Sequence, residues 1–427
     1  MIPAHASGNS SPLQCDLLIV DTSSTSGQAE DDPLRVIVIG AGQAGLSAAA
    51  HLLRKGLQPW RDVVVLDGND GPGGAWRHRW DSLTFDAAHG IHDLPGFPLG
   101  DPDPREPASR VVARYYGAYE RELGLPVVRP AAATAVERAD DGLFRVTASD
   151  GSVRRAHAVI SATGTWNRPH WPAYPGMREF AGRQLHTRDF ASAEEFAGQR
   201  LLVVGGGTSA LQFLLQLQDA GAHTVWSTRR EPDWTDRFFD KSWGADVEAS
   251  VSARTTTGLP PLSVVAATGL PLTEQYRHGI DDGTLISRGP LLRLTQTGAV
   301  LDGPRPDGRG LPSQGTIVDA LLDQSERPAA ALPGHPSEAD GSSAWETPVD
   351  AVLWATGFRA VLDHLAPLRL RQPGGGVQME EDGVSVSGEP GLFLVGYGAS
   401  ASTIGATRAG RAAALGAVRN TESLTRP

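Results

Sequence analysis

The chain of 427 residues is longer than one hydrophobic core usually serves, so we expect about two domains. Its formal net charge of -11 provides no basic face, which argues against nucleic acid and an anionic membrane surface as partners. No apolar run approaches the roughly 18 residues of a membrane-spanning helix. The single cysteine, Cys15, excludes an internal disulfide and the cysteine pair of a disulfide reductase, and it favours a cytoplasmic location.

An apolar run over residues 36–39 leads directly into glycines with the spacing G-x-G-x-x-G. In such a turn Gly40 permits the bend from strand to helix, Gly42 lets the backbone approach a pyrophosphate, and Gly45 allows close helix packing. The pyrophosphate then lies at the helix N-terminus, where free N–H groups favour negative charge. The next strand ends in Asp67, which is placed to accept hydrogen bonds from ribose hydroxyls. This order of elements predicts a dinucleotide-binding unit.

Another pair of glycines follows this unit. Gly73 and Gly74 allow close backbone approach, and Trp76 offers a flat face. The three-ring system of a flavin would suit such a wall. The alternative interpretation is a turn with a buried tryptophan.

Three short extended runs separated by Asp-Gly pairs come next, a pattern typical of a small antiparallel meander. The last run ends in Ala-Thr-Gly at residues 162–164, and the same three residues recur at 355–357 after another apolar run. Two strand ends of the same kind indicate two places where the chain crosses between domains.

A second glycine turn follows an apolar run over residues 201–204. Gly205 and Gly207 repeat the first two glycines, and an alanine takes the third place, as the pattern permits. The strand after the helix ends in Arg229 and Arg230 and not in an acid. An acid would repel a 2'-phosphate, whereas an arginine pair can bind it through charge-assisted hydrogen bonds. NADPH is therefore favoured over NADH, and solvated surface arginines are the alternative.

The C-terminal part contains a buried-type strand over residues 391–398 and then a small-residue helix near Thr403. The positive end of that helix would face a ligand and stabilise negative charge on a reduced flavin. Two other stretches carry no motif. Residues 1–33 predict a mobile N-terminal extension, and the Pro-, Gly- and Ser-rich residues 301–346 predict a surface excursion.

Between the two glycine turns, residues 180–190 fit the pattern F-x-G-x-x-x-H-x-x-x-[FY]. With the two turns, the Gly-Gly-x-Trp of residues 73–76 and the Ala-Thr-Gly of residues 355–357, the chain resembles the class B flavoprotein monooxygenases. This group holds flavin-containing monooxygenases, YUCCA-type enzymes, N-hydroxylases and Baeyer-Villiger enzymes. The resemblance covers residues 34–419. The ending of the motif in Phe190 looks more like the flavin-containing monooxygenase branch.

The resemblance implies an α/β fold with two Rossmann-like dinucleotide-binding domains. An NADPH-binding domain (173–349) would be inserted into an FAD-binding domain (34–172 and 350–427). The residues implied for FAD are Gly40, Gly42, Gln43, Gly45, Asp67, Gly74, Trp76 and Thr403. The residues implied for NADPH are Gly205, Gly207, Thr208, Ser209, Arg229 and Arg230. In such families Gly182 and His186 of the motif are structural or position a linker.

The same resemblance implies an enzyme that inserts one oxygen atom from O2 into a small organic substrate through a flavin C4a-hydroperoxide, by N- or S-oxygenation or Baeyer-Villiger chemistry. Asp86 matches the position of an active-site asparagine in flavin-containing monooxygenases, so Asp86 and His89 are the candidate catalytic residues. Trp80, His92 and Trp166 are further pocket candidates, and no metal site is predicted. Two alternatives stay open: an NADPH-dependent flavin dehydrogenase or oxidase without oxygen transfer, and a flavin-binding redox sensor.

Overall fold

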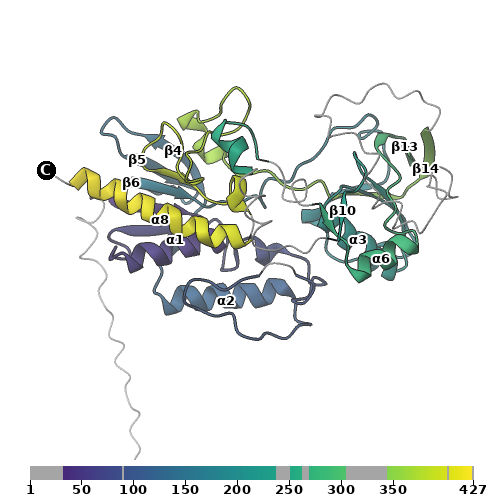
Figure 1. Cartoon of the computed structure of the whole chain (residues 1–427), viewed down its shortest axis with the longest axis horizontal. Helices are drawn as coiled ribbons and strands as arrows, with labels where there is room; N and C mark the ends of the chain where they lie inside the picture. The colour runs from purple at the N-terminus through teal and green to yellow at the C-terminus, as the bar shows by residue number, and fades with distance from the viewer. Residues whose placement is uncertain are drawn as a thin grey trace, which may run out of the picture.

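The computed structural model describes residues 32–88, 91–236, 251–261, 269–303, 344–401 and 403–425. The predicted N-terminal extension and the predicted excursion over 301–346 lie almost entirely outside these residues. The described residues form two lobes joined by narrow connections (Figure 1). The first lobe comprises residues 32–163, 251–261 and 358–425, and the second lobe comprises residues 172–236, 269–303 and 344–354.

The first lobe is built on a seven-stranded sheet with the order β3-β2-β1-β6-β5-β4, in which β16 also pairs with β6. Its strands are β1 (Leu34–Ile39), β2 (Val63–Leu66), β3 (Val127–Val128), β4 (Ala133–Arg138), β5 (Phe144–Ala148), β6 (Val153–Ser161) and β16 (Leu392–Leu394). Its helices are α1 (Gln43–Arg54), α2 (Ala108–Glu122) and α8 (Thr403–Thr425), with short 3-10 helices η1 (Gly74–His78), η4 (Asp363–Leu368) and η5 (Gly398–Ala401). The expected strand, glycine turn, helix and strand are therefore present.

The centre of this sheet carries the unbroken apolar run of the first glycine motif. β1 pairs in parallel with β2 on one side and with β6 on the other, and residues 36–39 are buried. The predicted meander is present as β4, β5 and β6, which pair antiparallel. Because β6 also runs in parallel beside β1 and β16, the residues after β6 arrive next to the first glycine turn.

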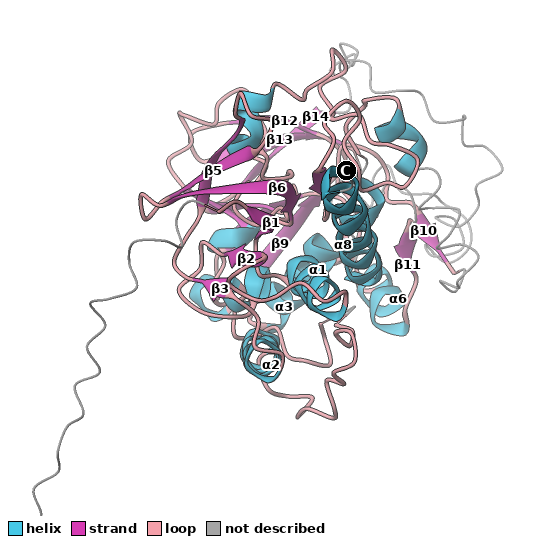
Figure 2. Ribbon diagram, turned by 90° about the vertical axis from the view of Figure 1, so that its left-hand side faces the viewer, coloured by secondary structure: helices cyan, strands magenta, loops and turns pink. Residues whose placement is uncertain are grey.

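Helix α8 lies along α1 on one side of the sheet, and both views show the two helices side by side (Figures 1 and 2). The two helices can approach closely only because the residue at the contact is glycine: a Cβ on Gly410 would lie 2.4 Å from the carbonyl oxygen of Ala44. The Ser47 hydroxyl donates to the carbonyl oxygen of Thr407 at 2.8 Å. These contacts hold the first turns of α8 beside the helix that follows the glycine turn.

The second lobe contains a four-stranded parallel sheet with the order β7-β15-β8-β9, a three-stranded antiparallel sheet β12-β13-β14 and the strand pair β10-β11. Its strands are β7 (Arg183–His186), β8 (Arg200–Val204), β9 (His223–Ser227), β10 (Trp234–Thr235), β11 (Leu270–Pro271), β12 (Leu291–Leu294), β13 (Gly298–Asp302), β14 (Ala344–Pro348) and β15 (Ala351–Trp354). Its helices are α3 (Thr208–Asp219) and α6 (Glu274–Asp281), with 3-10 helices η2 (Thr187–Asp189) and η3 (Glu194–Phe196). The predicted mixed α/β fold is confirmed.

Two segments lie on the other side of the predicted domain limits. β15 pairs with β7 and β8, so the chain returns to the first lobe after residue 354 and not at residue 350. Residues 251–261, expected inside the NADPH-binding domain, contact the first lobe, where the Met379 N–H donates to the carbonyl oxygen of Thr255 at 3.0 Å. Composition alone does not show which sheet a strand joins, because the choice depends on partners far away in the sequence.

Candidate functional site

The first glycine turn joins β1 to α1 and is closed by the segment that follows β6. Gly40 has a φ of +102°, and a Cβ on it would lie 2.5 Å from the carbonyl oxygen of Ala162. A Cβ on Gly45 would lie 1.8 Å from the carbonyl oxygen of Gly40. A Cβ on Gly42, by contrast, would meet no atom of the described chain within 4 Å. The fold therefore requires Gly40 and Gly45, whereas Gly42 leaves open space before the N-terminus of α1.

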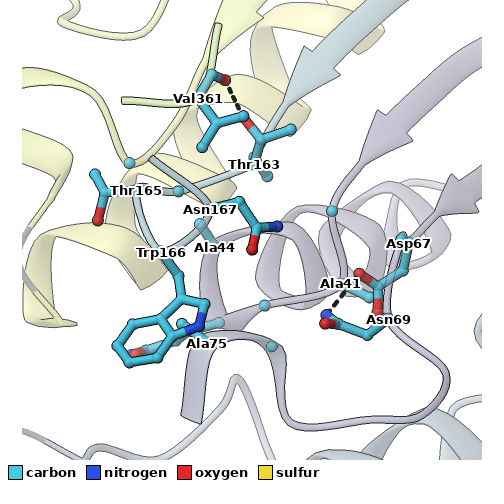
Figure 3. A pocket seen from close by; sticks show the side chains of 18 of the residues that line it. Ala41, Ala44, Asp67, Asn69, Ala75, Thr163, Thr165, Trp166, Asn167 and Val361 are labelled. Carbon is cyan, nitrogen blue, oxygen red and sulfur yellow. Dashed lines mark hydrogen bonds between the residues drawn. The ribbon is translucent and has the colours of Figure 1, made fainter. Parts of the chain in front are cut away.

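A cavity of about 350 Å³ opens at this turn (Figure 3). It is lined by the β1–α1 turn, the residues after β2, η1, the residues after β6, and the stretches around η4, η5 and the start of α8. The lining includes the predicted FAD ligands Gly40, Gly42, Gln43, Asp67, Gly74 and Trp76. Gly45 lies behind the turn, and Thr403 is the first residue of α8, between the lining residues Ala401 and Ala406. The fold thus gathers residues from distant parts of the sequence around one space.

Asp67 is buried at the end of β2, where neighbouring side chains fix its carboxylate. Its Oδ2 accepts a hydrogen bond from Nε of Arg129 at 2.7 Å. Its Oδ1 accepts one from Nδ2 of Asn69 at 3.1 Å, which Figure 3 shows. Arg129 also donates two bonds of 2.7 Å to the carboxylate of Glu120. These partners compensate the buried charges. Because each carboxylate oxygen can accept a further hydrogen bond, Asp67 can still accept hydrogen bonds from hydroxyl groups of a ligand.

Helix η1 and the residue after it place an aromatic side chain, Trp76, and a cationic one, Arg79, in the cavity wall. The guanidinium carbon of Arg79 lies 4.5 Å from the ring centroid of Trp166 and 5.7 Å from that of Trp76. All three residues line the cavity. Trp166 in turn stacks on Phe358, with 5.0 Å between ring centroids. Sequence reasoning named both tryptophans but missed Arg79, because an arginine in a turn carries no signal about what surrounds it.

Two further polar side chains of the lining were not predicted. Asn167 follows Trp166, and Figure 3 shows its amide in the middle of the pocket view. His364 of η4 is buried, and its Nε2 lies 3.0 Å from Oγ of Ser161 at the end of β6. Burial lowers the pKa of His364 to about 4, so its imidazole is neutral at pH 7. No motif marks either residue in the sequence.

Asp86, one of the two predicted catalytic residues, is not among the residues that line the cavity. Asp86 is exposed, and its carboxylate accepts hydrogen bonds from the Thr84 hydroxyl and from the next backbone N–H. These bonds, the one from Thr84 first, lower the pKa of Asp86. His89 lies outside the described residues. Of the further pocket candidates, Trp80 packs in a hydrophobic core and His92 is exposed.

The second glycine turn joins β8 to α3 and repeats the geometry of the first. Gly205 has a φ of +149°, and a Cβ on it would lie 2.1 Å from the carbonyl oxygen of Ala355. A Cβ on Gly207 would meet no atom of the described chain within 4 Å. Thr208 and Ser209 begin α3. The space in front of this helix N-terminus is therefore open in the same way as at Gly42.

Arg229 and Arg230 follow β9, next to the second glycine turn, and both are exposed. Within the described parts of the chain, neither arginine forms an ion pair. The pKa of His170 is lowered by burial first, then by the charge of Arg359 and then by that of Arg229. Since His170 belongs to the connection between the lobes, Arg229 lies near that connection. The two guanidinium groups are thus available to an anion at this position.

The two Ala-Thr-Gly sequences end β6 and β15, and the segments after them form a linker, residues 164–171 and 355–361. The Thr163 hydroxyl donates to the carbonyl oxygen of Val361 at 2.6 Å, as Figure 3 shows. The Thr356 hydroxyl donates to the carbonyl oxygen of His170 at 2.5 Å. The two segments therefore run antiparallel beside each other, and the chain passes between the lobes after each Ala-Thr-Gly sequence.

His186 of the sequence motif holds this linker. It is fully buried, its Nδ1 accepts a hydrogen bond from the Arg188 N–H at 3.2 Å, and its Nε2 lies 3.0 Å from the carbonyl oxygen of Gly357. With Nδ1 as acceptor, Nε2 carries the proton and donates it to Gly357. Burial lowers the pKa of His186, which keeps the ring neutral. A Cβ on Gly182 would lie 2.3 Å from the carbonyl oxygen of Asp350.

The chain is similar to known proteins in sequence and in fold. Residues 37–259, more than half of the chain, match the family model described as pyridine nucleotide-disulphide oxidoreductase. A flavin-containing monooxygenase of known structure from Stenotrophomonas maltophilia is 31% identical, with a TM-score of 0.68, over 92% of this chain and 100% of that chain. Indole-3-pyruvate monooxygenase YUCCA1 from Oryza sativa subsp. japonica is 36% identical over 44% of this chain and 45% of its own length. Flavin-containing monooxygenase 5 from Oryctolagus cuniculus is 25% identical over 76% and 62%, so the chain spans about half the length of these curated relatives.

The same fold occurs in an enzyme of different chemistry. Bacillithiol disulfide reductase from Bacillus cereus shares the fold, with a TM-score of 0.59 at 17% identity. An internal redox disulfide needs two cysteines, and this sequence has one. Among the described residues, no helix combines the length and apolar character needed to cross a bilayer. The chain belongs to the pyridine nucleotide-disulphide oxidoreductase family and, within it, to the flavin-containing monooxygenases.

Proposed function

We propose that this chain is an FAD- and NADPH-dependent monooxygenase that transfers one oxygen atom from O2 to a small organic substrate. The observation that carries this proposal is the matched pair of glycine turns, one in each lobe, each closed by an Ala-Thr-Gly segment of the linker. Flavin-containing monooxygenases use FAD and NADPH. We assign FAD to the first lobe and NADPH to the second, as two Rossmann-like domains of which the second is inserted into the first.

The first lobe fits FAD at three points. The open space at Gly42 lies before the N-terminus of α1, where N–H groups without helical partners attract a pyrophosphate. Asp67 is fixed by Arg129 and Asn69 with capacity left for ribose hydroxyls. The wall beyond Gly74 carries Trp76, whose flat face suits a flavin ring.

The second lobe fits NADPH in a parallel way. Gly207 offers the same open approach before α3 as Gly42 does before α1. Arg229 and Arg230 supply two cationic groups for a 2'-phosphate, where an acid would favour NADH. His186 fixes the linker through Gly357, and the linker sets the distance between the two sites.

Bound FAD supplies the redox chemistry, since its reduced form reacts with O2 and can pass one oxygen atom to a substrate. The protein binds, orients and excludes water. Trp166 covers the cavity from the linker side, and the Asn167 amide offers a hydrogen-bond donor within it. Because Asn167 lines the cavity and Asp86 does not, Asn167 is the stronger candidate for positioning a polar group near the flavin.

The proposed reaction is an N-oxygenation, an S-oxygenation or a Baeyer-Villiger oxidation. YUCCA1 is named for indole-3-pyruvate, a 2-oxo acid, and Tyria jacobaeae senecionine N-oxygenase, 24% identical over 48% of this chain, is named for an N-oxygenation. Both names describe the relatives and do not fix the substrate of this chain. A test of this chain therefore needs a panel with one substrate for each reaction type.

The test starts from purified protein reconstituted with FAD. NADPH should bleach the flavin under anaerobic conditions much faster than NADH does. With ¹⁸O2 and a panel of a tertiary amine, a thioether, a ketone and an aryl 2-oxo acid, at least one product should carry a single ¹⁸O atom. A flavin that NADPH does not reduce would contradict the proposal.

A dehydrogenase or oxidase on the same scaffold is the second candidate. The observation in its favour is Asp86, a carboxylate at the position where flavin-containing monooxygenases have an active-site asparagine. Rapid NADPH oxidation with one H2O2 per NADPH, and no ¹⁸O in any product, would favour it.

A further inference from the structure

Arg79 is a cation enclosed by indole rings. Its guanidinium carbon lies 4.5 Å from the ring centroid of Trp166, 5.7 Å from that of Trp76 and 5.9 Å from that of Trp80. Its Nε is buried and has no hydrogen-bond partner among the described residues. Burial lowers the pKa of Arg79 to about 10, so the side chain remains positively charged at pH 7.

Arg129, which binds the cavity-lining Asp67 from outside the lining, shows how a largely buried arginine of this fold is compensated when its role is structural. Nε, Nη1 and Nη2 of Arg129 all donate hydrogen bonds of 2.7 Å to the carboxylates of Asp67 and Glu120. Arg79 forms no ion pair within the described part of the chain. Indole faces attract the charge but accept none of the directional hydrogen bonds that a guanidinium donates. Arg79 is half-buried, and its buried Nε lacks such a partner among the described residues, which is destabilising unless a ligand supplies the acceptor.

The surroundings of Arg79 indicate the kind of ligand. Arg79, Trp76 and Trp166 line one wall of the cavity, and Trp166 stacks on Phe358 of the linker. This wall therefore combines a single cation with broad apolar faces. A guanidinium recognises a carboxylate through two parallel hydrogen bonds, while the faces bury an apolar body.

We propose that Arg79 binds the carboxylate of an organic-acid substrate whose apolar or aromatic body packs on Trp166, while Trp76 remains assigned to the flavin ring. This inference rests on the proposed function, because it names the substrate class of the same site. The Arg79 guanidinium recognises a pair of anionic oxygens, which either a substrate carboxylate or a cofactor phosphate can supply. The two sources are separated by experiment.

The experiment uses the FAD-loaded, oxidised protein without NADPH or a reducing agent. Phenylacetate and its neutral analogue phenylacetamide are titrated separately, and binding is followed by the change in flavin absorbance and by calorimetry. NADP⁺ is titrated in parallel, and FAD affinity is measured on the apo-protein. We expect the wild-type protein to bind phenylacetate roughly 10- to 100-fold more tightly than phenylacetamide, since hydrogen bonds to charged groups are worth that much.

Arg79→Met should abolish the preference for the carboxylate and leave the affinities for NADP⁺ and FAD within about threefold of wild type. Arg79→Lys should retain part of it, because a lysine keeps the charge but not the paired donors. Arg77→Met is the matched control, since Arg77 lies two residues before Arg79, donates to the carbonyl oxygen of Pro72 and is not in the cavity lining. It should leave the preference unchanged.

Equal binding of phenylacetate and phenylacetamide by the wild-type protein would overturn the proposal. A loss of NADP⁺ or FAD affinity in Arg79→Met, with the carboxylate preference retained, would assign the anion to a cofactor and overturn it as well. If Arg79→Met does not fold, the retained fraction of the preference in Arg79→Lys decides, and full retention refutes the paired donor role. Because no step needs oxygen transfer, failure of the monooxygenase proposal would leave this result intact.

Discussion

Gly42 and Gly207 hold equivalent places in the two glycine turns, and replacing each by alanine separates the two proposed nucleotide sites. A Cβ on either residue meets no atom of the described chain within 4 Å. The φ values are -82° at Gly42 and -106° at Gly207, which alanine adopts without strain. Neither substitution should disturb the ligand-free fold, and each should stabilise it by up to about 1 kcal/mol through the unfolded state.

The effect of each substitution falls on the ligand. A methyl group that occupies the place of a pyrophosphate forces one of the two to move, and overpacking of this kind costs about 1–3 kcal/mol. This corresponds to a roughly 5- to 150-fold increase in Kd. Gly42→Ala should therefore weaken FAD binding, and Gly207→Ala should keep FAD and weaken NADP⁺ binding.

The assay measures FAD content after dialysis, the Kd of FAD from flavin fluorescence, the Kd of NADP⁺ from difference spectra, and the Tm of the apo-protein. Gly45→Ala is the control for a glycine that the fold requires, because its Cβ would lie 1.8 Å from the carbonyl oxygen of Gly40, and it should lower the Tm. An unchanged FAD affinity in Gly42→Ala would refute the reasoning. So would a loss of FAD in Gly207→Ala equal to that in Gly42→Ala.

Three further predictions follow from single groups. Replacing Arg229 and Arg230 by serine should raise the KM for NADPH about 10- to 100-fold and change that for NADH little; equal changes for both would contradict a 2'-phosphate site. His186→Gln should retain FAD but slow its anaerobic reduction by NADPH, because the bond to Gly357 positions the linker; an unchanged stopped-flow rate would assign His186 to stability alone. His364 has a pKa lowered from 6.5 to about 4, so the unfolded state binds more protons between these values, and stability should fall by about 3 kcal/mol as the pH drops from 6.5 to 4. Urea titrations of His364→Gln should show a flatter pH dependence, and an identical slope would exclude His364 as its source.

The nucleotide turns could be predicted from the sequence because close backbone approach requires glycine at fixed spacing. Gly40 and Gly205 have positive φ, and each lies against the alanine of an Ala-Thr-Gly segment. The motif occurs twice in the sequence because this contact occurs twice in the structure. The identity of Asp67 as the acid at the end of β2 followed from the same local pattern. Local geometry is what a motif encodes.

The partners of these residues could not be predicted, because they come from elsewhere in the chain. Asp67 is held by Arg129, 62 positions away, and Arg129 by Glu120 of α2. Arg79 looks like any arginine in the sequence, and only the three-dimensional structure shows that it lies among indoles without a carboxylate. The same reason explains β15, whose apolar residues suit either sheet and whose neighbours, β7 and β8, decide the matter.

The most direct test of the central claim is rapid mixing of FAD-loaded, NADPH-reduced protein with oxygenated buffer, with oxygen consumption, flavin absorbance and H2O2 recorded together. If the chain is a monooxygenase, oxygen disappears at once while H2O2 release and the return of oxidised flavin lag behind, and added NADP⁺ lengthens that lag. Immediate return of oxidised flavin with stoichiometric H2O2, unaffected by NADP⁺, would contradict the account and establish an oxidase.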